Sequence, residues 1–525
     1  MTVFPSLYPE VALSDMSITE RLFQGLEGRP DDVAIIDGPT GRALTSAALV
    51  DRIRALAGGL VERGFAPGRT IAILAPNCPE YAVVFHGVAF AGGTITTLNP
   101  TYTAPEIQHQ LRDAGAVMLV TIPALADLAR AGMKGTPVTD LVVIGGGAEG
   151  ALSLDDLMGP PQAAQAPVDL DRFAVVLPYS SGTTGRPKGV MLSHRNIVTN
   201  VNQLAVPTGI ERGETVIAFL PFFHIYGMTV LMNLVLGQEG RLVTMPRFDL
   251  EQFLHLIQTH GVSRLYIVPP VALALAKHPL VAQYDMSSVR FIFSGAAPLS
   301  AEVEIAVGER LGAESIQGYG MTEMSPVSHS TYRGKPRHGS SGQAVPNTEC
   351  RIVEPETGRD LGPDEEGELW VRGPQVMMGY LNNAEATAAT LTNDGWLKTG
   401  DLAVIDGDGY MFIRDRLKEL IKYKGFAVAP AEVEAALIAH EKIIDAAVVG
   451  KPDDEAGELP VAFVVAAPDA ELDGAAVMAH LEGCLAHYKQ PAEVRFVDSV
   501  PKSASGKILR RFLRDELRAE GAERP

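Results

Sequence analysis

The sequence predicts an α/β protein built from more than one domain, and two observations carry this prediction. The chain has 525 residues, which is too long for one ordinary hydrophobic core, so we expect two or more domains. Its first 160 residues alternate short apolar runs, typical of buried strands, with longer segments that carry helix start and stop signals. Such alternation is typical of a sheet with helices packed on it.

Each element of this first part has a local signal. Thr45 has a side chain suited to cap a helix and Gly64 is suited to end one, so we expect a helix that runs to about residue 63. Short apolar runs predict strands at residues 33–37, 70–74 and 117–121. Two further helices are expected at residues 79–91 and 105–114.

A change of pattern at residues 414–416 marks a domain boundary. The stretch before it is rich in strand signals, and the stretch of about 110 residues after it mixes helices and strands. Pro430 suits the first position of a helix. Further strands are expected near residues 446–449 and 461–466, and further helices near 474–485 and at the basic C-terminus. We therefore divide the chain into residues 1–414, a hinge at 415–416, and residues 417–525.

Composition excludes several classes of protein. The net charge is −19, which argues against nonspecific binding to nucleic acid or anionic membranes. Cys78, Cys350 and Cys484 lie far apart, and their spacing indicates neither a metal site nor a disulfide framework. The N-terminus lacks a signal-peptide pattern and no apolar stretch approaches the ~20 residues of a membrane span. We expect a cytoplasmic protein without a nucleic-acid partner.

The most informative segment is a loop rich in serine, threonine and glycine at residues 178–189, after an apolar run at 173–177. Glycines let the backbone approach an anion, and free N–H groups in such a turn cradle it. The spacing differs from that of the common P-loop. A flexible linker is the alternative, but linkers rarely lie between two apolar runs. The predicted phosphate ligands are Ser180, Ser181, Gly182, Thr183, Thr184, Gly185 and Lys188.

Seven motifs, in order along nearly the whole chain, resemble those of the adenylate-forming enzymes. This superfamily includes acyl-CoA synthetases, the adenylation domains of peptide synthetases and beetle luciferases. The motifs lie at residues 178–194, 221–227, 294–298, 317–323, 395–401, 414–430 and 501–511. Within the superfamily the chain looks most like the 4-coumarate–CoA ligase branch, on matches at residues 223–226, 294–298, 317–323 and 415–426.

The resemblance implies a fold and a reaction. The fold is a large N-terminal α/β domain with a β-rich subdomain, followed by a small α+β lid domain, with Asp415 as the hinge between them. The reaction is an ATP-dependent ligation: an acid and MgATP give acyl-AMP and pyrophosphate, and coenzyme A then gives the thioester and AMP. ATP, Mg²⁺ and coenzyme A are therefore the expected cofactor and co-substrates.

The resemblance assigns the nucleotide contacts as well. Attack of one anion on another needs cations and preorganised donors, and Lys507 matches the lysine that bridges the substrate carboxylate and the α-phosphate. Asp401 matches the carboxylate that binds the ribose hydroxyls, and Arg416 matches a second ribose or phosphate contact. Lys418 and Lys422 either match further nucleotide contacts or form an exposed helix face, and both interpretations stay open.

The segment Gln-Gly-Tyr-Gly-Met-Thr-Glu matches the one that packs on adenine and reaches the phosphates. Gln317 and Gly318 begin it, and Tyr319 offers a flat stacking face. Thr322 matches a hydroxyl donor to the α-phosphate. Glu323 matches the Mg²⁺ ligand, since Mg²⁺ is usually held by one or two carboxylates and phosphate oxygens.

The acyl pocket follows from the same resemblance. His224 matches an aromatic gate near the acyl carboxylate, and Tyr226 lies on the same face of the chain if this segment is an extended strand. The peptide-synthetase branch usually has an aspartate in place of His224, so its absence argues against amino-acid substrates. The remaining wall positions are Gly295, Gly318, Met324 and Ser325.

Coenzyme A has two expected contact regions. Lys424 and Gly425 match the lid loop that borders the thiol channel, and Arg247 stands where this branch has a lysine that faces the CoA phosphates. Because the thiol of CoA is the nucleophile, the reaction needs no catalytic cysteine. Two departures change the pocket wall: Ala427 replaces the usual glutamine, and Met324 with Ser325 replaces alanine and glycine.

The identity of the acid stays open between a phenylpropenoic acid, a benzoic acid and a medium-chain fatty acid. A stand-alone adenylating enzyme that serves a carrier protein is the rival activity. A nucleotide-binding protein without chemistry is disfavoured, because Lys507, Glu323 and Asp401 are intact. Pro501 and the Gly506-Lys507 pair also resemble the target of bacterial acetyltransferases, which predicts acetylation of Lys507. We expect a monomer or a homodimer.

Overall fold

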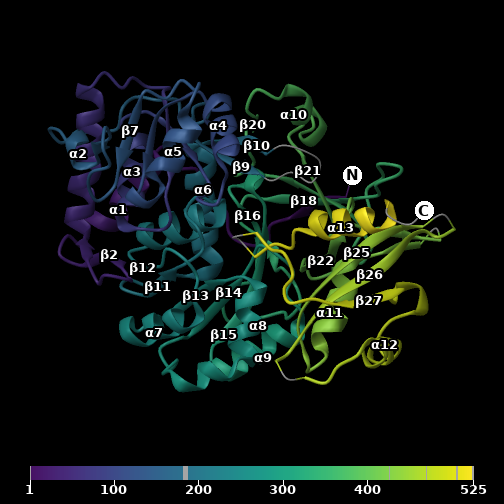
Figure 1. The fold of residues 1–525 in the computed structure, drawn as a ribbon. Helices are drawn as coiled ribbons and strands as arrows, with labels where there is room; N and C mark the ends of the chain where they lie inside the picture. Colours follow the sequence, from purple (N-terminus) through teal and green to yellow (C-terminus); the bar gives the residue numbers. More distant parts are fainter. Residues whose placement is uncertain are drawn as a thin grey trace.

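The computed structural model of the chain describes residues 2–180, 187–424, 426–453, 455–468, 470–503 and 506–522. The described residues form four β-sheets, three of them before residue 417 and the fourth after it (Figure 1). No helix in these ranges is both long and apolar enough to cross a lipid bilayer.

The first sheet has eight strands and is parallel from β9 to β8, with antiparallel strands added at one edge. The central strands are buried along most of their length, which fits a parallel sheet covered on both faces. In spatial order the strands are β20 (Gly379–Tyr380), β10 (Lys188–Ser193), β9 (Ala174–Ser180), β5 (Thr94–Thr97), β4 (Thr70–Leu74), β6 (Ala116–Thr121), β7 (Asp140–Val143) and β8 (Leu152–Ser153).

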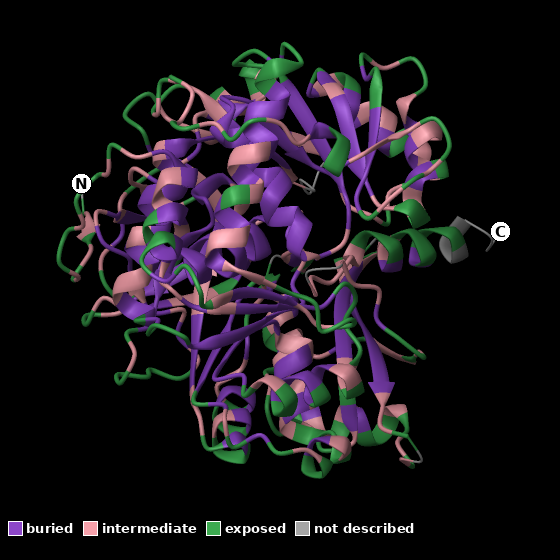
Figure 2. Cartoon of the chain, turned by 90° about the vertical axis from the view of Figure 1, so that its left-hand side faces the viewer, coloured by how far each residue is buried: buried purple, intermediate pink, exposed green. Residues whose placement is uncertain are grey.

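The second sheet has nine strands, parallel from β15 to β2, with antiparallel strands at both edges. In spatial order its strands are β17 (Gln343–Ala344), β16 (Val327–Ser330), β15 (Glu314–Gly320), β14 (Phe291–Ser294), β13 (Arg264–Ile267), β11 (Thr215–Ala218), β12 (Arg241–Thr244), β2 (Val33–Asp37) and β3 (Ala43–Thr45). Its central strands β11, β13 and β14 are buried along their whole length, and buried strands are purple in Figure 2.

Helix α3 (Pro79–Phe90) lies between these two sheets, because it contacts β4 and β5 of the first sheet and β2 of the second. Every one of its residues is buried, as expected for a helix that is apolar all round. The other helices before residue 417 are α1 (Ile18–Glu27), α2 (Ser46–Glu62), α4 (Ala104–Asp113), α5 (Ala126–Met133), α6 (His194–Thr208), α7 (Leu250–His260), α8 (Pro269–Lys277), α9 (Ala301–Leu311) and α10 (Ala384–Thr390).

The third sheet is antiparallel and is the β-rich part of the chain. Its first strand comes from the start of the chain, since Phe4 pairs with Cys350 and Pro5 with Glu349. In spatial order the strands are β1 (Phe4–Pro5), β18 (Glu349–Val353), β19 (Gly367–Arg372), β21 (Leu397–Ile405) and β22 (Met411–Arg416).

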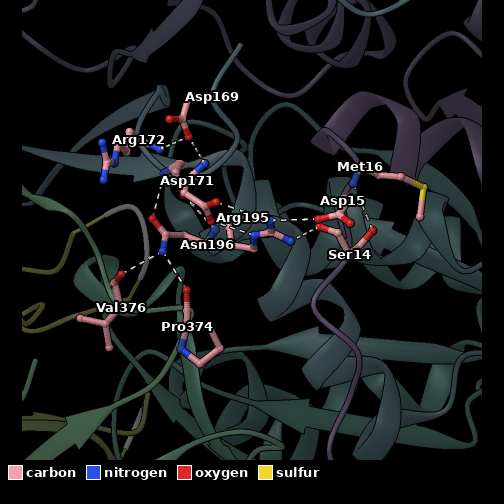
Figure 3. A network of polar contacts seen from close by, with 11 residues as sticks. Ser14, Asp15, Met16, Asp169, Asp171, Arg172, Arg195, Asn196, Pro374 and Val376 are labelled. Atoms are coloured by element: carbon pink, nitrogen blue, oxygen red, sulfur yellow. Dashed lines mark hydrogen bonds and ion pairs between the residues drawn. The ribbon is translucent and has the colours of Figure 1, made fainter. Parts of the chain in front are cut away.

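Polar side chains at the start of α6 hold distant segments together (Figure 3). Arg195 donates from Nε to Asp171 at 2.8 Å and from Nη2 to Asp15 at 3.2 Å. Asn196 donates from Nδ2 to the carbonyl oxygens of Pro374 and Val376, at 2.8 and 2.9 Å. The helix that follows the phosphate loop is therefore tied both to the N-terminal segment and to the chain that leads into β20.

The small C-terminal domain is built on a sheet of five strands with β27 parallel to β26. It has its own apolar core, formed by residues such as Val433, Val448 and Val464. Its strands are β24 (Phe426–Val428), β23 (Ile421–Tyr423), β26 (Gly457–Ala466), β25 (Ile443–Asp453) and β27 (Glu493–Phe496), and its helices are α11 (Pro430–Ala439), α12 (Gly474–Glu482) and α13 (Arg510–Ala522).

The fold class and the local signals are confirmed. The strands expected at residues 33–37 and 70–74 form with those bounds, and the Thr45 hydroxyl accepts the expected capping bond from the Ala48 N–H. Helix α11 begins at Pro430 as expected. Strand β2 joins the second sheet through β12, whereas the strands β4 and β6 that follow it belong to the first sheet. Its partner is about two hundred residues away, so no local pattern indicates the pairing.

Candidate active site

The predicted phosphate loop connects two antiparallel strands. Ser180 ends β9, Lys188 begins β10, and the two residues pair across the strands. The Lys188 ammonium lies 4.6 Å from the centroid of the Tyr380 ring, within the range of a cation–π contact. The other predicted loop ligands, Ser181, Gly182, Thr183, Thr184 and Gly185, lie outside the described residues.

The candidate ribose site is formed by three residues from different elements. Asp401 on β21 is buried, and its Oδ2 accepts a hydrogen bond of 2.6 Å from the Tyr319 hydroxyl. Arg416, its cross-strand partner on β22, lies 3.3 Å from Oδ1. Burial and the Asp401 carboxylate raise the pKa of Tyr319, so this hydroxyl remains a donor. The structure thus brings together three residues that the sequence separates widely.

The candidate Mg²⁺ ligand is also held by a tyrosine. Glu323 is buried, and its Oε1 accepts a 2.8 Å hydrogen bond from the Tyr380 hydroxyl. Tyr380 thereby contacts both Glu323 and Lys188. Among the described residues no group of three or more acidic, histidine or cysteine side chains is arranged as a complete metal site. A single carboxylate suits Mg²⁺ that takes its other ligands from phosphate and water.

His224 lies at the mouth of this site, but the chain around it differs from the expectation. The expected extended strand is wrong: Ile225 begins a helical segment, and Tyr226 opens a π-helix, η3 (Tyr226–Val235). The apolar strand β11 has already ended at Ala218, and Gly227 packs against the backbone of Pro221 where a Cβ would come within 2.2 Å. Because Gly227 packs this closely on Pro221, the chain turns here and does not continue as an extended strand.

The histidine is neutral in this environment. Its Nδ1 accepts from the Tyr226 N–H at 3.3 Å. Burial, and to a smaller extent the positive charge of Lys507, lower the pKa of His224 to about 4. The two residues belong to different domains.

The candidate acyl wall is aromatic and depends on two glycines. A Cβ on Gly295 would lie 3.2 Å from the Tyr226 ring, and a Cβ on Gly318 would lie 2.3 Å from the Phe293 ring. The two rings face each other edge-on, with centroids 6.5 Å apart. Met324 is fully buried beside them in the core. Gly318 therefore leaves room for the Phe293 ring where any other residue would collide, and Gly295 lets the Tyr226 ring pack closely on the backbone.

Two predicted contact residues have side chains that are already occupied. Gln317 accepts from the Leu299 N–H at 3.0 Å and donates to the Leu299 carbonyl at 2.9 Å. Ser325 donates to the carbonyl of Gln375 at 2.8 Å and is fully buried. Both side chains therefore bind within the protein and stabilise the walls of the site. The backbone atoms of these two residues remain as the groups that could contact a ligand.

Lys507 reaches the N-terminal domain on a short loop. Its own N–H is bound by the Ser503 hydroxyl at 3.1 Å. Gly506 packs on the start of α8, where a Cβ would lie 3.0 Å from Val268. Burial lowers the pKa of Lys507 to about 8, and the positive charge of Arg416 acts in the same direction. The loop is therefore docked against the domain that holds His224.

A cavity of about 30 Å³ lies where the predicted groups meet. His224 and Thr322 line it. Its other wall contains Tyr179, whose hydroxyl donates to Asp113 at 2.6 Å, and it also includes Tyr102. The sequence interpretation missed Tyr179 and Tyr380. Their hydrogen-bond partners, Asp113 and Glu323, lie far away in the sequence, and no local motif indicates such contacts.

The remaining predicted residues lie on the C-terminal domain or the surface. Lys418 lies in a turn and Lys422 in strand β23, and both are exposed, so the expectation of a helix face there is wrong because this segment pairs in the sheet. Lys424 is exposed with a positive φ of 47°, and its neighbour Gly425 lies outside the described residues. Arg247 is exposed between β12 and α7.

The expected hinge residue is anchored to both domains. Asp415 lies on β22, opposite Leu402 of β21. Its Oδ1 accepts from the Arg416 N–H at 2.6 Å, and its Oδ2 accepts from the Ala431 N–H in the first turn of α11 at 2.9 Å. Because Ala429 supplies no side-chain cap for α11, the carboxylate of Asp415 performs this role.

Two family models match the chain. That of the AMP-binding enzyme matches residues 22–381, and that of the AMP-binding enzyme C-terminal domain matches residues 432–507. Among curated proteins, 4-coumarate–CoA ligase 5 of Oryza sativa subsp. japonica is 42% identical over 98% of both chains. The probable 4-coumarate–CoA ligase 1 of Dictyostelium discoideum is 38% identical, again over 98% of both chains.

Two solved structures that superpose on the chain are CoA ligases for aryl acids. The anthranilate CoA ligase AuaEII, solved with anthranoyl-AMP, superposes with a TM-score of 0.90 at 28% identity and covers 98% of this chain and 99% of its own. A benzoate CoA ligase from Burkholderia xenovorans LB400 superposes with a TM-score of 0.87 at 25% identity, over 95% of this chain and all of its own.

Proposed function

The chain belongs to the AMP-binding enzyme family, and we propose that it joins an aryl or arylpropenoic acid, of the 4-coumarate type, to coenzyme A. It is an AMP-forming acid–thiol ligase that acts through an acyl-AMP. The observation that carries the proposal is the packing of the Lys507 loop, through Gly506, on the start of α8 in the domain that holds His224, Asp401 and Glu323.

Adenylation needs positive charge where the carboxylate meets the α-phosphate. A carboxylate oxygen attacks the α-phosphorus of ATP and pyrophosphate leaves, so two anions must approach each other. Lys507 would lie between the carboxylate and the α-phosphate, and Thr322 would donate to the same phosphate. Asp401 and Arg416 would hold the ribose, and Tyr319 would pack on the adenine while it positions Asp401. Glu323 would hold Mg²⁺, which supplies charge neutralisation at the phosphates when bound.

Thioester formation would use another edge of the C-terminal domain. The CoA thiol attacks the acyl carbonyl and AMP leaves. We assign Lys424 and Gly425 to the border of the thiol channel and Arg247 to the CoA phosphates. Because Lys507 and Lys424 lie on different loops of one small domain, the domain would rotate about Asp415 between the half-reactions. Lys418 and Lys422 would contact the nucleotide from the exposed turn and strand.

The aryl preference is supported by the shape of the acyl wall. Tyr102, Tyr179 and Phe223 line the cavity that His224 and Thr322 also line. Flat aromatic faces of this kind pack well on a planar ring. Benzoate and medium-chain fatty acids are the alternative substrates, and a carrier protein is the alternative acceptor.

A substrate panel tests the proposal. AMP release would be measured with hydroxycinnamic, benzoic and C6–C16 fatty acids, with and without CoA. We expect the largest kcat/KM with a hydroxycinnamic acid and a CoA thioester as the product. A preference for fatty acids would replace the substrate class but keep the ligase. Acyl-AMP without thioester would favour the carrier-protein enzyme instead.

Three further expectations remain part of the proposal. The enzyme would be cytoplasmic and would act as a monomer or homodimer. Lys507 would be acetylated by a lysine acetyltransferase when the C-terminal domain swings it into solvent, which removes its charge. Treatment with such an acetyltransferase and acetyl-CoA, followed by site mapping and adenylation assays, tests this. An enzyme fully acetylated at Lys507 that still adenylates would exclude both the regulation and the role of Lys507.

A further inference from the structure

A buried arginine lies three residues after Lys507, at the first position of α13. The Nη2 group of Arg510 donates to both carboxylate oxygens of Glu434, at 2.8 and 2.7 Å. Its Nη1 donates to Glu419, and its Nε donates to the carbonyl of Val448 at 3.3 Å. One guanidinium therefore joins three segments: α11, the turn after the hinge, and β25.

The loop that carries Lys507 is connected to its own domain on both sides of the lysine. Before it, Lys502 pairs with Asp445 on β25 at 2.6 Å, and after it the Leu509 N–H donates to the Pro501 carbonyl at 2.8 Å and Arg510 makes the contacts above. Three residues span at most about 10–11 Å of chain. Fixing Arg510 therefore confines Lys507 to a small region in front of the N-terminal domain.

The same arginine is linked to the hinge. Glu419 follows Asp415 by four residues, and Asp415 binds the first turn of α11 through the Ala431 N–H. Glu434 lies on that same helix and accepts a hydrogen bond from Arg510. Asp415 thus binds α11 through a backbone N–H, and Arg510 joins α11 to the turn after the hinge through Glu434 and Glu419, whose side chains are each 9% exposed.

We propose that Arg510 is a positioning residue for the adenylation half-reaction, which holds the Lys507 loop in register with α11 and the post-hinge turn. The C-terminal domain and its lysine then reach the N-terminal domain as one rigid body. This inference rests on the proposed function. A lysine in its place would be a single point charge and would not bind both carboxylates and the Val448 carbonyl in the fixed geometry of a guanidinium.

Separate assays of the two half-reactions test the proposal. Pyrophosphate exchange reports adenylation, and thioester formation from supplied acyl-AMP reports the second step. We expect Arg510→Ala to lower the adenylation kcat by about 10²-fold, the effect of a small misplacement of a catalytic group. The KM values for ATP and acid should change less than kcat, because most of the residues assigned to these ligands, such as Asp401 and Thr322, lie on the N-terminal domain. Thioester formation should fall much less, and Arg510→Lys should recover part of the adenylation rate.

The neighbouring arginine provides a matched control. Arg511 is exposed, and its guanidinium lies 4.9 Å from the Phe512 ring. Arg511→Ala removes the same charge one position away and should leave both half-reactions near their wild-type rates. If Arg511→Ala matches Arg510→Ala, general loss of positive charge explains the effect and the proposal is wrong.

Chemical labelling of Lys507 gives a measurement that does not depend on turnover. The rate at which an amine-reactive reagent modifies Lys507, followed by mass spectrometry across pH, yields its accessibility and its pKa. The charges around it are Arg416 and Arg510, which lower the pKa, and Glu419 and Asp401, which raise it; across the domain boundary lies the neutral His224 ring. Loss of Arg510 removes one lowering charge and loosens the loop, so labelling should quicken and the pKa should rise.

Different results would contradict the positioning role and the proposed function. Equal losses in both half-reactions by a folded Arg510→Ala protein, or unchanged labelling of Lys507, would overturn the positioning role. If Arg510→Ala does not fold, Glu434→Gln keeps the side-chain shape and should show a smaller effect in the same direction. Failure of the wild type to form acyl-AMP with any acid would contradict the proposed function instead. The labelling of Lys507 would still test whether Arg510 positions its loop.

Discussion

Arg264 and Arg510 both have largely buried side chains with carboxylate partners, and they differ in what lies next to them. Arg264 opens β13, has no exposed side-chain surface, and pairs with Glu214. It also donates to the carbonyls of Thr208 and Gly209, at 2.7 and 2.6 Å. Arg510 has the same kind of environment in the C-terminal domain, but it lies three residues from Lys507.

Their positions explain the difference in role. Arg264 lies at the amino end of a parallel strand, whereas ligand sites in such sheets form beyond the carboxyl ends. Its network therefore holds elements together at the edge remote from the site. Similar contacts at Arg510 fix a loop that must move with the domain. The same local chemistry thus has a structural consequence in one domain and a positional consequence in the other.

The largest expected effect tests the structural arginine. Removing one partner of a buried pair leaves an uncompensated charge, so Arg264→Ala should lower the free energy of unfolding by about 3–5 kcal/mol. Denaturant unfolding measures this, and the ratio of the half-reaction rates should stay at its wild-type value. Arg290 also contacts Glu214 but is largely exposed, so Arg290→Ala should lower stability by about 1 kcal/mol or less. A changed half-reaction ratio in Arg264→Ala would erase the contrast with Arg510.

The next effect concerns Lys507 itself. Lys507→Ala should lower the adenylation rate by about 10²–10³-fold, as for loss of one transition-state contact, with little effect on thioester formation from acyl-AMP. Lys502→Ala on the same loop breaks an ion pair with Asp445 and serves as the control. Because Lys507 acts when protonated and its pKa is lowered to about 8, adenylation should decline as pH rises through that value. Equal losses in both steps would contradict the assignment.

A smaller effect is expected at the hinge. Asp415→Ala removes the cap of α11, and such losses lower stability by about 0.5–2 kcal/mol. The change should be seen in thermal unfolding of the C-terminal domain, and Asp415→Asn should recover part of it because the amide oxygen still accepts one bond. If neither variant changes the stability of that domain, the Ala431 contact does not link the hinge to α11.

The smallest effect concerns how the stability of the N-terminal domain depends on pH. Burial lowers the pKa of His194 to about 4, so the unfolded chain takes up this proton first. The corresponding stability is complete above pH ~6.5 and decreases as pH falls towards 4, by at most about 1.4 kcal/mol per pH unit for one group. His194 Nδ1 accepts from the Ile18 N–H at 3.2 Å, and His194→Asn offers an oxygen there. The difference between the free energies of unfolding at pH 7 and pH 5 should narrow in this variant, while the buried His86 and His329, whose pKa values are also lowered, keep their contribution. An unchanged difference would show that His194 does not contribute.

Local features of the fold were predictable from the sequence, whereas long-range ones were not. The cap at Thr45 and the start of α11 at Pro430 depend on neighbouring residues, and both form as expected. The membership of β2 in the second sheet depends on a partner at residues 242–244. The exposed lysines after the hinge were expected as a possible helix face, but the pairing of β23 with β24 and β26 fixes them in a strand and a turn.

The site follows the same division. Lys507, Asp401 and Glu323 were identified through motifs, and the structure gives the last two the tyrosine partners Tyr319 and Tyr380. Those contacts join positions 82 and 57 residues apart, so composition and spacing carry no signal for them. The geometry around Tyr226 also escaped prediction, because close packing of Gly227 on a backbone carbonyl decides it.

The pairing of β1 with β18 also sets the order in which the chain can be completed during translation. Phe4 leaves the ribosome long before its partner Cys350. At about 5–20 residues per second the delay is roughly 17–70 s. Throughout that interval β1 is a strand without a partner, and once β18 emerges its open edge is a template for any other extended chain. The nascent protein therefore depends on its N-terminal segment staying free and unaggregated until two-thirds of the polypeptide has been made.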